Sequence, residues 1–323
     1  MKRPVAASAS VSEQTRQSSS LPPAEGPELV ATPIGPLPIG HDCRLAWRLR
    51  ARAHGTFPYG GRDFEIWACS ECGLGYTDPV PAEADSPALY QARSSRDFLP
   101  SDSRLLAWIK DWLARRDARS FCRGMREDAT ILDYGCGNGA FVRAMAAEKP
   151  RARVLGCDYH SAAPPGLDSG SYLSYGELDK VGGGIDLILL RHVLEHTYHP
   201  VDLLTDLGEL LRPGGVIGIE SPNLEAGVRH LFGRDWNGWY VPYHTLHFTR
   251  RSLQMVIEGA GLQVASIGGA DMPMIGRSLQ ARRRSDYGPG LMLLGALLQP
   301  AQLAIGFVTR SPVNLRARAI RPR

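Results

Sequence analysis

The chain has no apolar leader, no internal repeat and no strong overall charge. Met1-Lys2-Arg3 is basic, but Ala6 to Ser20 is polar and lacks the apolar stretch of a secretory signal peptide. The 323 residues are 43% hydrophobic and 22% charged, with a formal charge of +4, which argues against a fibrous or wholly disordered chain. We therefore expect a cytoplasmic globular protein whose six cysteines are reduced.

Positive charge is concentrated near the C-terminal end. Residues Ala281 to Arg323 contain eight arginines, no lysine and one acidic residue, Asp286, which gives this segment a charge of +7. Such a segment can contact the phosphates of a lipid surface or of nucleic acid. Because most basic runs are solvated faces, nucleic acid is not the expected partner, and peripheral contact with the inner face of the membrane is the alternative.

Composition divides the chain into three parts. Residues 1–38 are rich in serine and proline with no apolar period, which predicts a disordered tail. Residues 39–85 form a small aromatic, cysteine-containing module, and residues 86–323 form one α/β domain. Within that domain, residues 286–310 are apolar but interrupted by glycine and proline, which favours a helical insertion over a membrane span.

Strand and helix patterns alternate through the middle of the chain. Strands are predicted at 130–134, 153–157, 185–190 and 216–220, with helices at 140–148 and 200–211 between them. This alternation predicts a doubly wound, Rossmann-like sheet of seven mostly parallel strands. Residues 314–320 alternate like a strand and are expected to join the sheet last, in antiparallel orientation.

One segment combines an apolar strand, an acidic residue and three glycines at alternate positions, TILDYGCGNG from Thr130 to Gly139. Glycines in this pattern let the backbone bend sharply and approach a ligand closely. Their second spacing is one residue shorter than in the dinucleotide fingerprint. Asp133 would repel a pyrophosphate and suits an ammonium group, whereas Asp158 can accept both ribose hydroxyls of an adenosine ligand.

Four segments in this order resemble class I S-adenosylmethionine-dependent methyltransferases over roughly residues 100–270: ILDYGCGNGAFV, VLGCDYH, IDLILLRHVLEHTYHP and LRPGGVIGIESPN. The resemblance implies S-adenosylmethionine as cofactor, with Asp133 near its amino group and Asp158 on its ribose. It also implies that Glu177 or Leu178 borders the adenine. The methionine part would be lined by the turn residues Gly135, Cys136, Gly137, Asn138 and Gly139.

Histidines occur in two clusters. His192-Val193-Leu194-Glu195-His196 has the spacing of an inverted zincin. The region also resembles ubiquinone-type O-methyltransferases, in which Glu replaces His192 and the stretch can bind a divalent metal. A structural pair is therefore the expected role here, with metal as the alternative.

The second cluster follows the fifth predicted strand and contains PYHTLHFT, which resembles a segment of the same methyltransferases. It should fold over the carboxyl ends of the strands, where its aromatic residues can enclose an acceptor. His244 is the first candidate for the catalytic base and His247 the second. A purely anchoring role for His244 stays open.

Cys69-x-x-Cys72 is one half of a zinc knuckle, of which related methyltransferases often carry two. The other half is reduced here to His41-x-Cys43. A zinc site formed by these four residues and a degenerate ribbon held by its aromatic residues both stay open.

The leading hypothesis is a methyltransferase that acts at oxygen on a small-molecule or glycan-like acceptor. A nicotinamide-dependent sugar enzyme on the same sheet is the second enzyme class. The third reading is a non-catalytic module in which the aromatic loop and the basic C-terminal segment bind a membrane or glycolipid.

Overall fold

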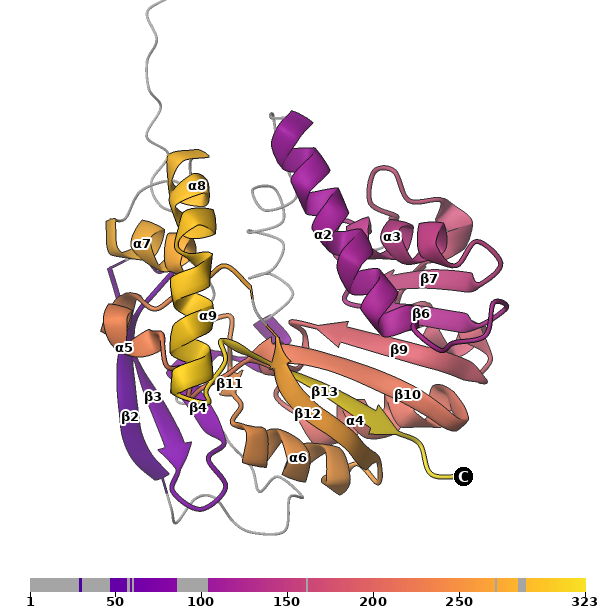
Figure 1. Ribbon diagram of the computed structural model, residues 1–323. Helices are drawn as coiled ribbons and strands as arrows, with labels where there is room; N and C mark the ends of the chain where they lie inside the picture. Colours follow the sequence, from indigo (N-terminus) through magenta and orange to yellow (C-terminus); the bar gives the residue numbers. More distant parts are fainter. Residues whose placement is uncertain are drawn as a thin grey trace, which may run out of the picture.

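The computed structural model in Figure 1 describes residues 29–30, 47–56, 59, 61–85, 104–160, 162–270, 272–283 and 289–323. The predicted zinc ligands His41 and Cys43, and most of the predicted disordered tail, lie outside these residues. Within that tail, Leu29–Val30 (β1) pairs antiparallel with Val80–Pro81 (β5).

The main sheet has seven strands in the order β12-β13-β10-β9-β6-β7-β8 (Figure 1). All neighbouring pairs are parallel except those that involve β13, which is antiparallel to β10 and to β12. The predicted fold class is confirmed, including the antiparallel last strand. The strands are Thr130–Tyr134 (β6), Arg153–Asp158 (β7), Tyr172–Ser174 (β8), Ile185–Arg191 (β9), Leu211–Pro222 (β10), Gln263–Ala270 (β12) and Asn314–Ile320 (β13).

Helices cover both faces of this sheet, and alternate residues of β9 show how. Leu187 and Leu189 pack in one cluster with Phe121 of α2 (Arg104–Cys122) and with α3 (Ala140–Glu148). Ile188 and Leu190 pack in another cluster with α4 (Pro200–Leu210) and α6 (Arg250–Gly259). Because β9 is buried on both faces, its sequence is a continuous apolar run.

A second, antiparallel sheet has the order β11-β4-β3-β2. Three of its strands come from the cysteine-containing module, Trp47–His54 (β2), Asp63–Cys69 (β3) and Gly75–Asp78 (β4). The fourth, Leu246–His247 (β11), belongs to the aromatic loop after β10 and pairs with β4, Leu246 opposite Tyr76. The module and the loop that carries the second histidine cluster are therefore parts of one sheet.

The remaining helices lie around the second sheet. They are Arg229–Phe232 (α5), Ile275–Arg283 (α7), Pro289–Leu297 (α8) and Gln299–Val308 (α9), the last two formed by the apolar segment. Within the described part of the chain, no helix is long and apolar enough to cross a membrane. Short 3-10 turns occupy Glu83–Asp85 (η2), Ser169–Ser171 (η3), Tyr175–Val181 (η4), Leu194–His196 (η5) and Gly233–Asp235 (η6).

Candidate active site

The glycine turn connects β6 to α3 at the carboxyl edge of the main sheet. Gly135, Gly137 and Gly139 have φ angles of 79°, 54° and 70°, in the left-handed region that strains other residues. The amides of Gly135 and Cys136 both donate to the carbonyl oxygen of Cys157 on β7, at 2.7 and 3.0 Å. The turn is thus held against the end of β7. Its opposite edge faces the carboxyl ends of the strands, where ligands of such sheets bind.

Asp158 ends β7 and closes this turn from the other side. Its Oδ2 accepts a hydrogen bond from the Gly137 amide at 2.7 Å, and its Oδ1 accepts one from the Tyr159 amide at 2.8 Å. Each carboxylate oxygen has a second lone pair, so the group can still accept hydrogen bonds from hydroxyl groups. Asp158 therefore lies where the sequence predicts the ribose contact.

Asp133 is buried beneath the turn, on the sheet face that carries α3. Burial raises its pKa to about 7, although the nearby Arg191 guanidinium acts in the opposite direction. Arg191 donates to Glu220 at 2.8 Å and lies over the Phe141 ring, and Arg316 of β13 binds the same Glu220. Acidic and basic side chains thus alternate across four adjacent strands.

Glu177 is held by its own 3-10 turn. Its carboxylate accepts from the Ser174 amide and hydroxyl and binds Lys180 at 2.6 Å, contacts that lower its pKa to about 2. Tyr175 instead stacks on Tyr134 with ring centres 4.6 Å apart, and its hydroxyl is 3.8 Å from the position of a Cβ at Gly135. The adenine contact of Glu177 or Leu178 remains a prediction, and Tyr175 is a neighbour of the turn that sequence reasoning missed.

The two histidine clusters meet next to the glycine turn. His192 follows β9 with a φ of 55°, and its Nδ1–H donates to Glu195 Oε1 at 3.1 Å. Glu195 is buried, and its Oε1 lies 3.9 Å from Nε2 of His244 in the aromatic loop. The Thr245 amide donates to the Glu195 carbonyl at 2.9 Å, which ties the loop to this position.

Each imidazole of this group has a defined orientation. Nδ1–H of His244 donates to the Gly238 carbonyl at 3.0 Å, and Nδ1–H of His196 donates to the Tyr243 carbonyl at 2.8 Å. In a neutral His244 the bond to Gly238 leaves Nε2 with a lone pair. Burial lowers the pKa of His244 well below its usual value, so this ring is neutral. Although burial opposes its ionisation, contacts with His192 and His196 keep the pKa of Glu195 low, so the carboxylate is charged.

Two atoms of this group carry unused hydrogen-bonding capacity. Glu195 Oε2 and His192 Nε2 are buried and have no hydrogen-bond partner among the described residues. Unsatisfied buried polar atoms are costly and are often found at functional sites. Both atoms are acceptors, so an acceptor hydroxyl could donate its single proton to either one of them.

His247 lies behind this group, within the second sheet. Thr77 donates its hydroxyl proton to the His244 carbonyl at 2.6 Å, so Nε2–H of His247 donates to Thr77 Oγ1 at 2.9 Å. Burial lowers the pKa of His247 to about 3. The contacts of His247 join β11 to β4, which is an anchoring arrangement.

The tryptophans of the aromatic loop do not line an open site. Trp236 and Trp239 are buried in a third apolar cluster, which also contains Phe64 and Ile66 of β3 and Ile275 of α7, and their ring centres lie 4.8 Å apart. Of the aromatic residues expected to enclose an acceptor, Tyr240 is only half-buried, and its ring lies tilted against that of His244 with ring centres 5.4 Å apart. The loop therefore contributes histidines to the site, while its tryptophans stabilise the loop and do not form an aromatic surface for an acceptor.

A metal was the alternative for the stretch His192 to His196, and zinc was one reading of the cysteine module. In the structure, Glu195 and His196 group with His244 of the aromatic loop in place of His192. Glu195, His196 and His244 offer ligand atoms that all lie within 4.8 Å of one another, so this group can hold one ion. Cys69 and Cys72 are buried, and their predicted partners His41 and Cys43 lie outside the described residues. Zinc in the cysteine module remains a prediction.

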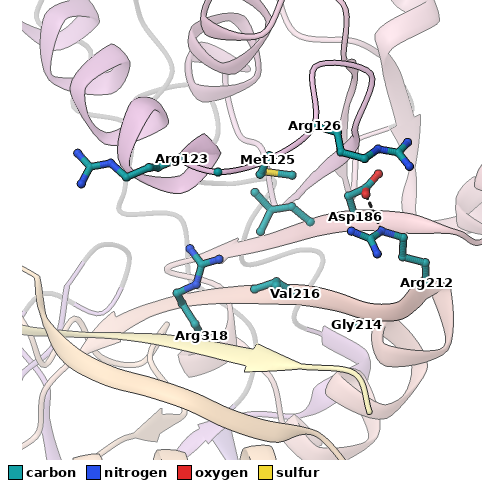
Figure 2. Close-up of a pocket in the computed structure, with 10 residues that line it drawn as sticks. Arg123, Met125, Arg126, Asp186, Arg212, Gly214, Val216 and Arg318 are labelled. Carbon is teal, nitrogen blue, oxygen red and sulfur yellow. Dashed lines mark hydrogen bonds and ion pairs between the residues drawn. The ribbon is translucent and has the colours of Figure 1, made fainter. Parts of the chain in front are cut away.

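A hollow of about 160 Å³ lies at the opposite, amino edge of the main sheet (Figure 2). Arg123, Arg126 and Arg318 line it, together with the ion pair of Arg212 and Asp186 at 2.6 Å. None of the predicted site residues lines this hollow. Because ligands of open parallel sheets bind at the carboxyl ends of the strands, the reaction is expected at the glycine turn instead.

The strand order, the glycine turn after β6 and the acidic residue Asp158 at the end of β7 define a class I methyltransferase. This is the class that takes its methyl group from S-adenosylmethionine. Residues 103–267 match the model of a family described as a methyltransferase domain, and the chain belongs to that family. The resemblance to class I methyltransferases seen in the sequence is thereby confirmed.

Individual relatives match part of the chain. A ubiquinone biosynthesis O-methyltransferase of Caulobacter vibrioides is 32% identical over 150 residues, 42% of this chain and 59% of the relative. A trans-aconitate 2-methyltransferase of Deinococcus radiodurans is 34% identical over 101 residues, 30% of this chain and 39% of the relative. The chain thus spans less than two thirds of the length of these relatives. A SAM-dependent methyltransferase of Archaeoglobus fulgidus has a TM-score of 0.44 and 16% identity, covering 65% of this chain and 94% of that one.

Proposed function

We propose that the protein transfers a methyl group from S-adenosylmethionine to a hydroxyl oxygen of a small-molecule acceptor. The observation that carries the proposal is the group of half-buried His192 with buried Glu195 and His244, next to Val193, which packs against the glycine turn. The names of the two relatives, which refer to ubiquinone biosynthesis and to trans-aconitate, support a small molecule over a macromolecule.

The turn residues would hold the cofactor. The left-handed glycines expose backbone to the methionine part, and Asp158 accepts the ribose hydroxyls. The pKa of Asp133 is about 7, and the ammonium group of the cofactor would place a positive charge beside this carboxyl group. The binding of that ammonium group would favour the ionised carboxylate.

The chemistry is an in-line displacement. A lone pair of the acceptor oxygen forms the new C–O bond while the C–S bond breaks and its electron pair stays on sulfur, which converts the sulfonium to a neutral thioether. The hydroxyl proton passes to His192 Nε2. The ionised Glu195 accepts the Nδ1–H of His192 and would stabilise the resulting imidazolium.

His244 would orient the acceptor rather than take its proton. Its low pKa makes it a weak base, but its Nε2 lone pair can accept a hydrogen bond. Should a divalent ion occupy Glu195, His196 and His244, these residues fit it, and the ion would polarise the acceptor oxygen as a Lewis acid.

The test is methyl transfer with cofactor that carries a deuterated methyl group, followed by mass spectrometry of a cell extract. We expect a small molecule to gain the labelled methyl group at oxygen with wild-type protein and not with His192→Gln. Labelled product at nitrogen or carbon would contradict the acceptor class. Isothermal titration with S-adenosylmethionine separately tests the cofactor.

Neither alternative function gains support at this site. The family match is to methyltransferases, which argues against a nicotinamide-dependent enzyme. A purely non-catalytic module would not need a charged carboxylate buried against two histidines.

A further inference from the structure

Helices α8 and α9 form nearly one continuous helix (Figure 1). Leu298, the single residue between them, bonds to both helices: its amide donates to the Leu294 carbonyl at 3.0 Å, and its carbonyl accepts from the Gln302 amide at 3.0 Å. From Pro289 to Thr309 there is no charged residue. The outward face of this helix must therefore be uncharged.

That face is also strongly exposed. We call it the apolar stripe, formed by Leu293, Leu297, Pro300, Ala304, Phe307 and Val308. The first five positions follow one another at intervals of four or three residues, so they lie on one side of the helix. Phe307 is 85% exposed and Val308 79%. A contiguous exposed apolar surface of this kind marks an interaction site.

The opposite face holds the helix firmly to the protein. Gln302 is buried, and its Oε1 accepts from the Met274 amide at 2.9 Å while its Nε2 donates to the Met272 carbonyl at 2.8 Å. Leu298 and Ile305 pack against the third apolar cluster. The rotation of the helix is thus determined by its inner face, and the stripe faces outward as a consequence.

Arginines flank the helix pair along the chain. Arg283 ends α7, which precedes α8, and Arg310 follows α9, and both side chains are exposed. An uncharged helical face bounded by arginines matches a surface with an apolar interior and anionic headgroups. A second copy of the chain fits poorly, because either antiparallel or parallel pairing of two stripes would bring arginines of the two copies together.

We propose that α8 and α9 dock the protein on the surface of an anionic lipid bilayer. The apolar stripe enters the boundary between headgroups and acyl chains, with Arg283 and Arg310 on lipid phosphates. Because the opposite face is bound to the protein through Gln302, Leu298 and Ile305, only the stripe can meet the bilayer, and the helix pair lies in the plane of the interface.

The test is flotation of full-length protein with vesicles of phosphatidylglycerol and phosphatidylcholine, and with vesicles of phosphatidylcholine alone. We expect the wild type to float with the anionic vesicles, and Phe307→Asp to bind at least about tenfold more weakly. Trp112→Asp is the matched control, since Trp112 is 52% exposed on α2, outside the stripe. Circular dichroism shows whether each variant is folded.

A double variant, Arg283→Gln with Arg310→Gln, separates charge from apolar insertion and should lose binding to the anionic vesicles. The proposal is overturned if folded wild type does not float, or if Phe307→Asp floats as well as wild type. It is also overturned if light scattering finds a wild-type dimer that Phe307→Asp dissociates while neither protein floats.

Discussion

Val193 occupies the space that a β-carbon on Gly135 would need, since that carbon would lie 2.5 Å from Val193 Cγ2. The contact joins the glycine turn, which would hold the cofactor, to the segment after β9 that carries His192 and Glu195. A side chain at position 135 would therefore separate the two halves of the candidate active site.

Gly135→Ala should weaken cofactor binding by at least tenfold and lower stability by ~1–3 kcal/mol, because it combines left-handed strain with the Val193 contact. Gly124→Ala is the matched control: Gly124 has a φ of 76°, but nothing lies within 4 Å of its β-carbon position. Titration calorimetry and urea unfolding measure both effects. Equal cofactor affinity in the two variants would contradict the role of the contact.

His192→Gln should lower kcat by about 10²–10⁴ while cofactor affinity stays within about twofold, because the proton acceptor is lost but the turn is intact. His247→Asn, which disturbs the bond to Thr77, should instead lower the free energy of unfolding. A larger loss of kcat in His247→Asn than in His192→Gln would mean that His247, and not His192, takes the proton.

Asp158→Ala should abolish detectable cofactor binding at micromolar protein, since it removes the ribose acceptor and leaves the Gly137 amide without its partner. Asp158→Asn keeps one acceptor oxygen and should retain weak binding. Titration with S-adenosylmethionine distinguishes the variants, and unchanged affinity in Asp158→Ala would contradict the predicted site.

Asp133 should make the protein less stable as the pH rises. The pKa of this carboxyl group is raised from 3.8 to about 7 on folding, so between these values the folded state binds more protons than the unfolded state. Its contribution to stability therefore falls as pH increases through this window and stays low above it. Glu195 and Glu220, whose pKa values are lowered, contribute with the opposite sign.

The comparison of wild type with Asp133→Asn isolates this residue. Urea unfolding at pH 5 and at pH 8 should show that the wild type loses more stability between the two values than the variant does. A parallel pH dependence of the two proteins would mean that Asp133 ionises normally.

A chelator separates the two roles available to the group of Glu195, His196 and His244. If His192 takes the proton without a metal, dialysis against EDTA should leave kcat unchanged. Loss of activity that one divalent ion restores would assign the group to metal binding. Metal analysis of the same preparation, with Cys69→Ser as a comparison, tests zinc in the cysteine module.

Local patterns were sufficient for the main sheet and the cofactor turn. The central strands β6 and β9 contain apolar runs, and three glycines between a strand and a helix require a tight turn, so neighbouring residues determine both. The aromatic loop was harder to interpret: its tryptophans were expected beside an acceptor, but they are buried in a cluster that the sequence around them does not reveal.

The sequence by itself determined the order of strands and helices, the glycine turn and its two acidic neighbours, because these depend on residues a few positions apart. Only the tertiary structure decided that His192 and Glu195 face His244 across nearly fifty residues, that β11 joins the sheet of the cysteine module, and that the apolar stripe faces outward. These features depend on packing between distant segments, and side-chain periodicity along one segment carries no information about which partner it meets.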